Sequence, residues 1–121
     1  MDGMTKAKGR MLGTRSYGPA EAVLTIPAAL PRHMHAHVRE VTSVRVDSER
    51  RGEGLGSELM RHICREADLM GMALMLSVEP FDGGMSTREQ LEAWYERFGF
   101  ARIQEQPVVI MVRAVRGRVV H

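Results

Sequence analysis

The strongest hydrophobic pattern in the first half of the chain lies at residues 38–46, which are rich in valine and threonine. A short run of β-branched residues predicts a β-strand. Val44 and Val46 alternate as one face of a strand requires, whereas Val41 falls on the opposite phase. A β-bulge near Thr42–Ser43 would bring all three onto the same face. We therefore expect a bulged strand here.

A helical pattern follows after a short polar loop. From Leu55 onward, apolar residues recur four positions apart, at Leu59, Ile63 and Ala67. This spacing places them on one face of an α-helix. Gly71 is suited to end the helix, because glycine readily adopts the left-handed conformation that closes many helices.

The second half of the chain begins with a strand and another helix. Residues 72–78 form a nearly continuous apolar run, typical of a strand that is covered on both faces. Ser86 and Glu89 have the spacing of a capping box and predict the start of a second helix, which Gly99 closes. One face of this helix carries four large apolar residues: Leu91, Trp94, Tyr95 and Phe98.

The remaining segments are short. Residues 100–104 and 108–112 predict the last two strands. Near the start, residues 1–20 are expected to include an edge strand, and residues 21–26 form another short strand. This order of elements predicts one α/β (α+β) domain with a mixed sheet over residues 1–121.

The composition, with 44% hydrophobic and 26% charged residues, is typical of a globular protein. The only cysteine, Cys64, excludes an internal disulfide and a cysteine-based zinc site, and its helical apolar neighbours predict a buried structural thiol. No apolar run approaches the roughly 18 residues of a membrane span, and no signal-peptide stretch begins the sequence. We expect no membrane partner and a cytoplasmic location.

The net charge is +2 and the sequence pI is about 9.1, with the arginines scattered along the chain. Nucleic-acid binders concentrate their basic residues on one face, so a nucleic-acid partner is not favoured. A mild positive field still suits an anionic ligand such as a phosphorylated cofactor.

A glycine-rich loop at residues 51–56 is the main candidate for chemistry. Arg51 is followed by Gly52, Gly54 and Gly56, and the predicted helix begins at once. Free N–H groups at a helix start bind anions, and glycines let a phosphate approach the backbone closely. The spacing matches neither the ATP-type phosphate loop nor the dinucleotide fingerprint. A flexible glycine turn without a ligand is the structural alternative.

Residues 44–60 resemble the acyl-CoA-binding motif of the GNAT superfamily of N-acetyltransferases. In that motif an arginine or glutamine precedes two small residues at fixed spacing, and Arg51, Gly54 and Gly56 match these positions. Residues 93–100 resemble the second motif of the family, a tyrosine-bearing helix end closed by glycine and phenylalanine. The two motifs stand in the family's order with an apolar strand between them.

The resemblance covers residues 38–112 and implies a GNAT-like fold. This fold is a mixed, splayed central sheet flanked by helices, with the pantetheine arm of CoA between residues 38–46 and 72–78. The family usually places a further strand and two helices ahead of this core, where they help to form the acceptor groove. Residues 1–37 are a shorter, variable lead, so we expect a shortened N-terminal region.

The resemblance also implies acetyl-CoA as the acyl donor and a primary amine as the acceptor, with no metal. The acceptor could be a protein lysine, a protein N-terminus, an antibiotic or a polyamine. The residues expected to bind the donor surround the loop: Val44, Arg45, Val46, Arg51, Gly52, Glu53, Gly54, Leu55, Gly56 and Ser57.

The family transfers the acetyl group by direct attack of the amine, without an acyl-enzyme. Tyr95 matches the tyrosine that protonates the thiolate leaving group, although it could simply pack beside its apolar neighbours. Glu40 stands where some members carry a general base, although it could be a solvated residue beside Arg39. A backbone N–H near residues 44–46, freed by the bulge, would meet the oxyanion.

Residues 27–37 are expected to form a loop or a short helical turn. His33, His35 and His37 alternate there, so an extended backbone would place all three on one face. They could form a metal or acceptor-site cluster, but an exposed polar face is favoured.

Two further expectations concern function and assembly. A non-catalytic acyl-CoA-binding or regulatory module is the alternative to an acetyltransferase, because the acceptor region is short.

The short lead would also leave the edge of the sheet and the rim of the cofactor cleft exposed. We therefore expect a homodimer, with residues 1–37 or 108–112 at its interface.

Overall fold

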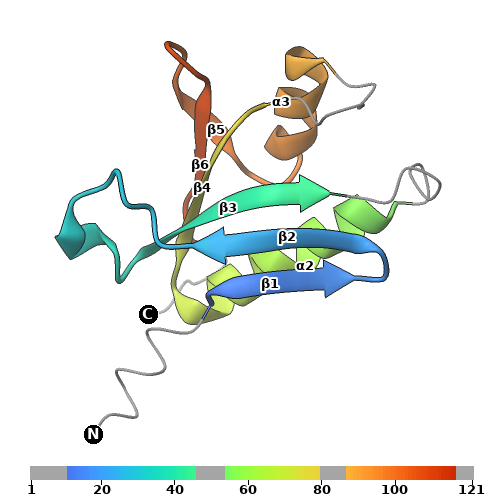
Figure 1. Ribbon diagram of the computed structural model, residues 1–121, viewed down its shortest axis with the longest axis horizontal. Helices are drawn as coiled ribbons and strands as arrows, with labels where there is room; N and C mark the ends of the chain where they lie inside the picture. Colours follow the sequence, from blue (N-terminus) through green and yellow to red (C-terminus); the bar gives the residue numbers. More distant parts are fainter. Residues whose placement is uncertain (1–10, 46–53, 80–86, 117–121) are drawn as a thin grey trace, which may run out of the picture.

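The computed structural model describes residues 11–45, 54–79 and 87–116. They form one six-stranded mixed sheet with strand order β1-β2-β3-β4-β6-β5 (Figure 1). The elements are β1 (Gly13–Tyr17), β2 (Ala20–Thr25), a short 3-10 helix η1 (Arg32–Met34), β3 (Val38–Arg45), α2 (Leu55–Met70), β4 (Ala73–Ser77), α3 (Arg88–Glu96), β5 (Ala101–Gln104) and β6 (Ile110–Arg113). The predicted α+β class, edge strand and short helical turn are confirmed.

Both long helices cover the same face of the sheet. β3 and β4 are parallel neighbours in the sheet, and α2 connects them. β4 is followed along the chain by α3 and β5, and β5 lies two strands beyond β4 in the strand order. Right-handed crossovers that advance in one direction across a sheet place their helices on one face. Figure 1 shows α2 running across one side of β1, β2 and β3. We call this the covered face, and the opposite one the open face.

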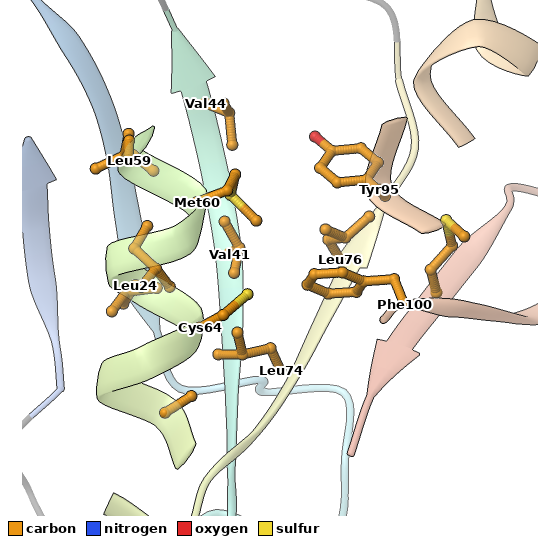
Figure 2. Close-up of a cluster of buried hydrophobic side chains, with 14 of the residues drawn as sticks. Leu24, Val41, Val44, Leu59, Met60, Cys64, Leu74, Leu76, Tyr95 and Phe100 are labelled. Carbon is orange, nitrogen blue, oxygen red and sulfur yellow. The ribbon is translucent and has the colours of Figure 1, made fainter. Parts of the chain in front are cut away.

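Side chains alternate between the two faces along β2. Ala20, Ala22 and Leu24 are buried on the covered face, whereas the residues between them are only half-buried. The core therefore lies between the sheet and its helices. It joins side chains from both helices and all the central strands, including Leu24, Val41, Val44, Leu59, Met60, Cys64, Leu74, Leu76, Tyr95 and Phe100 (Figure 2).

The predicted bulge in β3 is confirmed. The register with β2 shifts after Thr42, where β3 has two residues opposite one residue of its partner. Ser43, the extra residue, has a positive φ of 54°. As a result Val41 and Val44, three positions apart, are both buried on the covered face. The broken alternation in the sequence thus had a structural cause.

The helix ends agree with the sequence with one exception. Gly71 closes α2 with a left-handed φ of 71°, as predicted. The capping box of α3 lies one residue later than predicted: Thr87 accepts from the amide of Gln90 and donates its own amide to the Gln90 side chain. The pattern of a hydroxyl residue followed by Glu or Gln occurs twice in overlapping register, and α3 uses the second. Ser86 lies outside the described residues.

A salt bridge secures the far end of α2 to the sheet. Arg113 of β6 donates from its two terminal nitrogens to the two carboxylate oxygens of Asp68, at 2.9 and 3.0 Å. Its Nε donates to the backbone carbonyl of Phe98. The Arg113 guanidinium holds the pKa of Asp68 below its ordinary value. This bidentate pair fixes α2, β6 and the turn after α3 relative to one another.

The parallel pairing of β3 and β4 is short. It spans three registered positions and ends at the pair Glu40–Met75, whereas β3 continues to Arg45 and β4 to Ser77. The two strands therefore separate beyond Glu40, as the splayed sheet requires. We call this point, defined by Glu40 and Met75, the fork.

Candidate active site

The start of α2 presents backbone N–H groups that the helix itself does not use. Gly54 is the N-cap residue, with a φ of 80° and no side chain to cap the helix. The first helical hydrogen bond runs from the amide of Glu58 to the carbonyl of Gly54 at 3.0 Å. The amides of Leu55, Gly56 and Ser57 precede it and find no backbone acceptor among the described residues. These donors and the positive end of the helix dipole favour an anion.

The end of β3 lies beside the first turns of α2. Val44 is buried in the same core cluster as Leu59, and Leu55 packs against that cluster. Arg45 points to the open face, where it forms an exposed ion pair of 3.0 Å with Glu21 of β2. The structure thus brings the predicted residues Val44, Gly54, Leu55, Gly56 and Ser57 into one region. Four other predicted donor-binding residues lie outside the described residues: Val46, Arg51, Gly52 and Glu53.

Tyr95 projects from α3 into the region where β3 and β4 separate. Figure 2 shows its ring beside Leu76 and Phe100, with the hydroxyl oxygen directed toward the side of Val44. The residue is 4% exposed, and burial raises the pKa of Tyr95 to about 12. The phenol is therefore protonated at neutral pH. No described residue forms a hydrogen bond with its hydroxyl.

Glu40 occupies the fork itself. Its neighbours Arg39 and Val41 point to the covered face, so strand alternation directs Glu40 to the open face. Arg39 is buried and donates to the backbone carbonyls of His35 and Val38. Within the three described segments, the Glu40 carboxylate makes no ion pair or hydrogen bond with another described residue. Glu40 and Tyr95 thus approach the fork from opposite faces of the sheet.

Ser57 and Trp94 form a contact that the sequence did not predict. The indole Nε1–H of Trp94 donates to the Ser57 hydroxyl at 3.1 Å, which joins the first turn of α2 to α3. The sequence assigned Trp94 only to the apolar face of its helix. A half-buried indole normally needs an acceptor, which is the signal that could have prompted a search for one.

The remaining candidates are structural or exposed. Burial raises the pKa of Cys64 to about 11, which keeps this thiol protonated and agrees with a structural role. The segment with His33, His35 and His37 turns through η1 instead of extending, so the three side chains do not share a strand face. Across the described segments, no three His, Cys, Asp or Glu side chains are grouped to hold a metal ion.

Comparison with protein families identifies the class to which this fold and site belong. Residues 19–102 match the family model of the acetyltransferase (GNAT) domain. This match covers more than half of the chain, so the chain belongs to the GNAT acetyltransferase family. A search of curated protein sequences finds no match.

Solved structures share the fold at low sequence identity. The ribosomal-protein-S18-alanine N-acetyltransferase from Escherichia coli aligns with a TM-score of 0.61 and 19% identity, over 84% of this chain and 64% of its own. N-acetylglutamate synthase from Neisseria gonorrhoeae, solved with coenzyme A and N-acetyl-glutamate, aligns with a TM-score of 0.55 and 18% identity, over 81% and 23%. The anti-CRISPR protein AcrVA5 aligns with a TM-score of 0.62 and 18% identity, over 85% and 100%.

These alignments also show the extent of the shared core. The chain spans 60–64% of the length of four solved structures, the Escherichia coli enzyme among them, whereas it covers all of the anti-CRISPR protein. No helix in the described part of the chain is long and apolar enough to cross a membrane.

Proposed function

We propose that this protein is an N-acetyltransferase that moves an acetyl group from acetyl-CoA to a primary amine by direct attack. The observation that supports it most is the arrangement at the fork. The uncapped start of α2 and the Tyr95 hydroxyl lie on the covered face, and Glu40 stands at the fork on the open face. Each is a group that this reaction needs. The proposal includes a cytoplasmic location, which rests on the sequence alone.

The start of α2 is suited to the pyrophosphate of the donor. The amides of Leu55, Gly56 and Ser57 have no backbone acceptor among the described residues, and Gly54 has open space around the position of a Cβ atom. Backbone amides at a helix start hold phosphate oxygens without charged side chains, and Arg51 would add a charge-assisted contact. CoA held there would extend its pantetheine arm along the separating strands toward the fork.

The proposed reaction has two proton transfers. The amine attacks in its neutral form, and Glu40, directly or through a water molecule, accepts the one proton that the nitrogen loses as it becomes an amide. The amine nitrogen forms a bond to the thioester carbonyl carbon, and the oxyanion is met by a backbone N–H near residues 44–46, next to the bulge at Ser43. The C–S bond then breaks, and Tyr95 donates its phenolic proton to the thiolate. The products are an acetamide and CoA.

A non-catalytic acyl-CoA-binding module is the second candidate. The deep burial of Tyr95, between the rings of Trp94 and Phe100, favours it, because packing alone could explain a tyrosine in this position. Such a module would bind acetyl-CoA in the same region but would not turn it over. Binding and turnover therefore have to be measured separately.

The experiment that tests donor binding is a thermal-shift titration with acetyl-CoA. A ligand that binds only the folded state raises the melting temperature, by mass action. Arg51→Ala removes a charge and Gly54→Val obstructs the backbone, so both reduce the shift relative to the melting temperature of each unliganded variant. Arg65→Ala and Gly13→Val are the matched controls, since Arg65 is exposed and Gly13 also has a positive φ with open space. An undiminished shift in both test variants would reject the assignment.

We also infer that the protein forms a homodimer through a sheet edge. β6 lies inside the sheet, between β4 and β5. The two edges of the sheet that the described residues form are therefore β1, within residues 1–37, and β5. Near β5, Ile103 is 65% exposed and Val108 is 37% exposed. Exposed edges with apolar side chains are normally covered. Light scattering at micromolar concentration should give twice the chain mass of 13.6 kDa, and a value of 13.6 kDa would reject the dimer.

A further inference from the structure

The hydrogen bond between Trp94 and Ser57 joins two elements that flank the fork. Ser57 lies in the first turn of α2, and Trp94 lies beside Tyr95 on α3. Among the described residues this is the one side-chain hydrogen bond between the two helices. It is partly buried and spans 37 positions in the sequence.

The polarity of this bond is fixed by chemistry. An indole N–H can only donate, so the Ser57 oxygen must be the acceptor. The serine hydroxyl retains its own proton, which must then point away from the indole. Serines inside helices commonly donate this proton to a backbone carbonyl one turn earlier. Accepting from the indole fixes one side of the Ser57 oxygen, so its proton lies in another direction. The neighbouring amides of Leu55 and Gly56 find no backbone acceptor among the described residues.

The indole itself is held by aromatic contacts. The ring of Trp94 lies 5.1 Å from that of Tyr95 and 5.2 Å from that of Phe98, the latter edge to face. Tyr95 in turn lies 5.7 Å from Phe100, also edge to face. Tilted and edge-to-face contacts of this kind are the favoured arrangements of aromatic pairs. Trp94 therefore presents its N–H to Ser57 from a fixed position.

We propose that Trp94 is a positioning residue for the acyl donor: its indole N–H orients the Ser57 hydroxyl so that the hydroxyl donates to a phosphate oxygen of acetyl-CoA. This inference rests on the proposed function and adds a role for a residue that touches no donor atom. It also couples the phosphate-binding end of α2 to the helix that carries Tyr95.

The test is a double-mutant cycle on the KM for acetyl-CoA. Trp94→Phe keeps an aromatic ring and removes the N–H, and Ser57→Ala removes the hydroxyl. Each should raise KM about five- to tenfold, the effect of one lost hydrogen bond, with kcat changed less than about twofold. The double variant should be no worse than Ser57→Ala alone, because both changes remove the same interaction. Ser57→Thr keeps a hydroxyl and should restore the wild-type KM, while Ser16→Ala on β1 is the matched control.

Fluorescence gives a second measurement, because Trp94 is the only tryptophan. Adding acetyl-CoA should change the indole emission of the wild type and of Ser57→Thr more than that of Ser57→Ala. Unchanged KM in Trp94→Phe, or additive effects in the double variant, would overturn the inference and leave the proposed function intact. Failure of the wild type to bind acetyl-CoA by thermal shift would overturn both.

Discussion

The two faces of the sheet differ in what covers them and in the residues they carry. On β2, Leu24 is 1% exposed beneath the helices, whereas its neighbour Thr25 is half-buried on the open face. Thr25 is registered with Glu40 of β3, and Thr42 lies on the same side two residues further on. The covered face is thus mostly apolar, whereas the open face carries hydroxyl and carboxylate groups beside the buried side chains of Val38 and Met75.

This difference indicates that the two faces have different roles at the fork. The covered face holds the core, the start of α2 and the proton of Tyr95, all of which serve the acyl donor in our proposal. The open face offers Glu40 at the same point, with no helix above it among the described residues. We infer that the amine approaches from the open face, so that base and acid act from opposite sides of the thioester.

Tyr95→Phe should have the largest effect on turnover. It removes the hydroxyl and keeps the ring that packs against Trp94 and Phe100. Loss of a general acid typically lowers turnover by ~10²–10⁴-fold, whereas the acetyl-CoA thermal shift should remain. Steady-state kinetics with an amine acceptor provide the measurement. Wild-type turnover in this variant would assign Tyr95 to packing alone and favour the binding-module alternative.

Leu24→Ala and Thr25→Ala compare the two faces at adjacent positions of one strand. Leu24→Ala leaves a cavity in the core and should lower the free energy of unfolding by about 3 kcal/mol. Thr25→Ala removes a half-exposed side chain and should change it by about 0.5 kcal/mol. Denaturant unfolding of both variants measures the contrast. Equal losses would mean that the open face is covered as well.

Glu40→Gln tests the open face chemically. The amide keeps the shape of the side chain and cannot accept the proton, so turnover at neutral pH should fall by about 10²-fold. This is near the low end of the effect expected for a general base, because solvent reaches the half-exposed Glu40. Donor binding and the free energy of unfolding should stay near wild type. Glu89→Gln, at an exposed position on α3, is the matched control. Unchanged kinetics would remove Glu40 from the mechanism.

Asp68→Asn tests the salt bridge that joins α2 to β6 on the covered face. The change leaves the buried guanidinium of Arg113 without its carboxylate and should cost about 2 kcal/mol at pH 7. Since the pKa of Asp68 is lowered in the folded state, this stabilisation is full above the ordinary aspartate pKa of about 4. It is lost as the pH falls through the lower folded value. The difference in unfolding free energy between wild type and variant should therefore narrow below about pH 4, and a constant difference would contradict the pairing.

Much of the fold followed from local patterns in the sequence. The misplaced phase of Val41 relative to Val44 predicted the bulge, and the apolar spacing after Leu55 predicted α2. The start of α3 was predicted one residue early, because two overlapping capping patterns fit the same segment. Local sequence does not distinguish such patterns when both leave the apolar face of the helix unchanged.

The candidate site was predictable to a smaller extent. Gly54 and Tyr95 were identified from motifs, but the position of Glu40 at the last registered pair with Met75 depends on where two strands separate. The bond from Trp94 to Ser57 depends on the packing of two helices that are distant in sequence. Such contacts arise from tertiary packing, which no local pattern encodes.

A crystal structure of the protein with CoA tests the central claim most directly. Our account predicts phosphate oxygens within about 3 Å of the amides of Leu55, Gly56 and Ser57, and the CoA sulfur at the fork beside the Tyr95 hydroxyl. CoA bound on another surface, with these amides hydrogen-bonded to the protein instead, would contradict it.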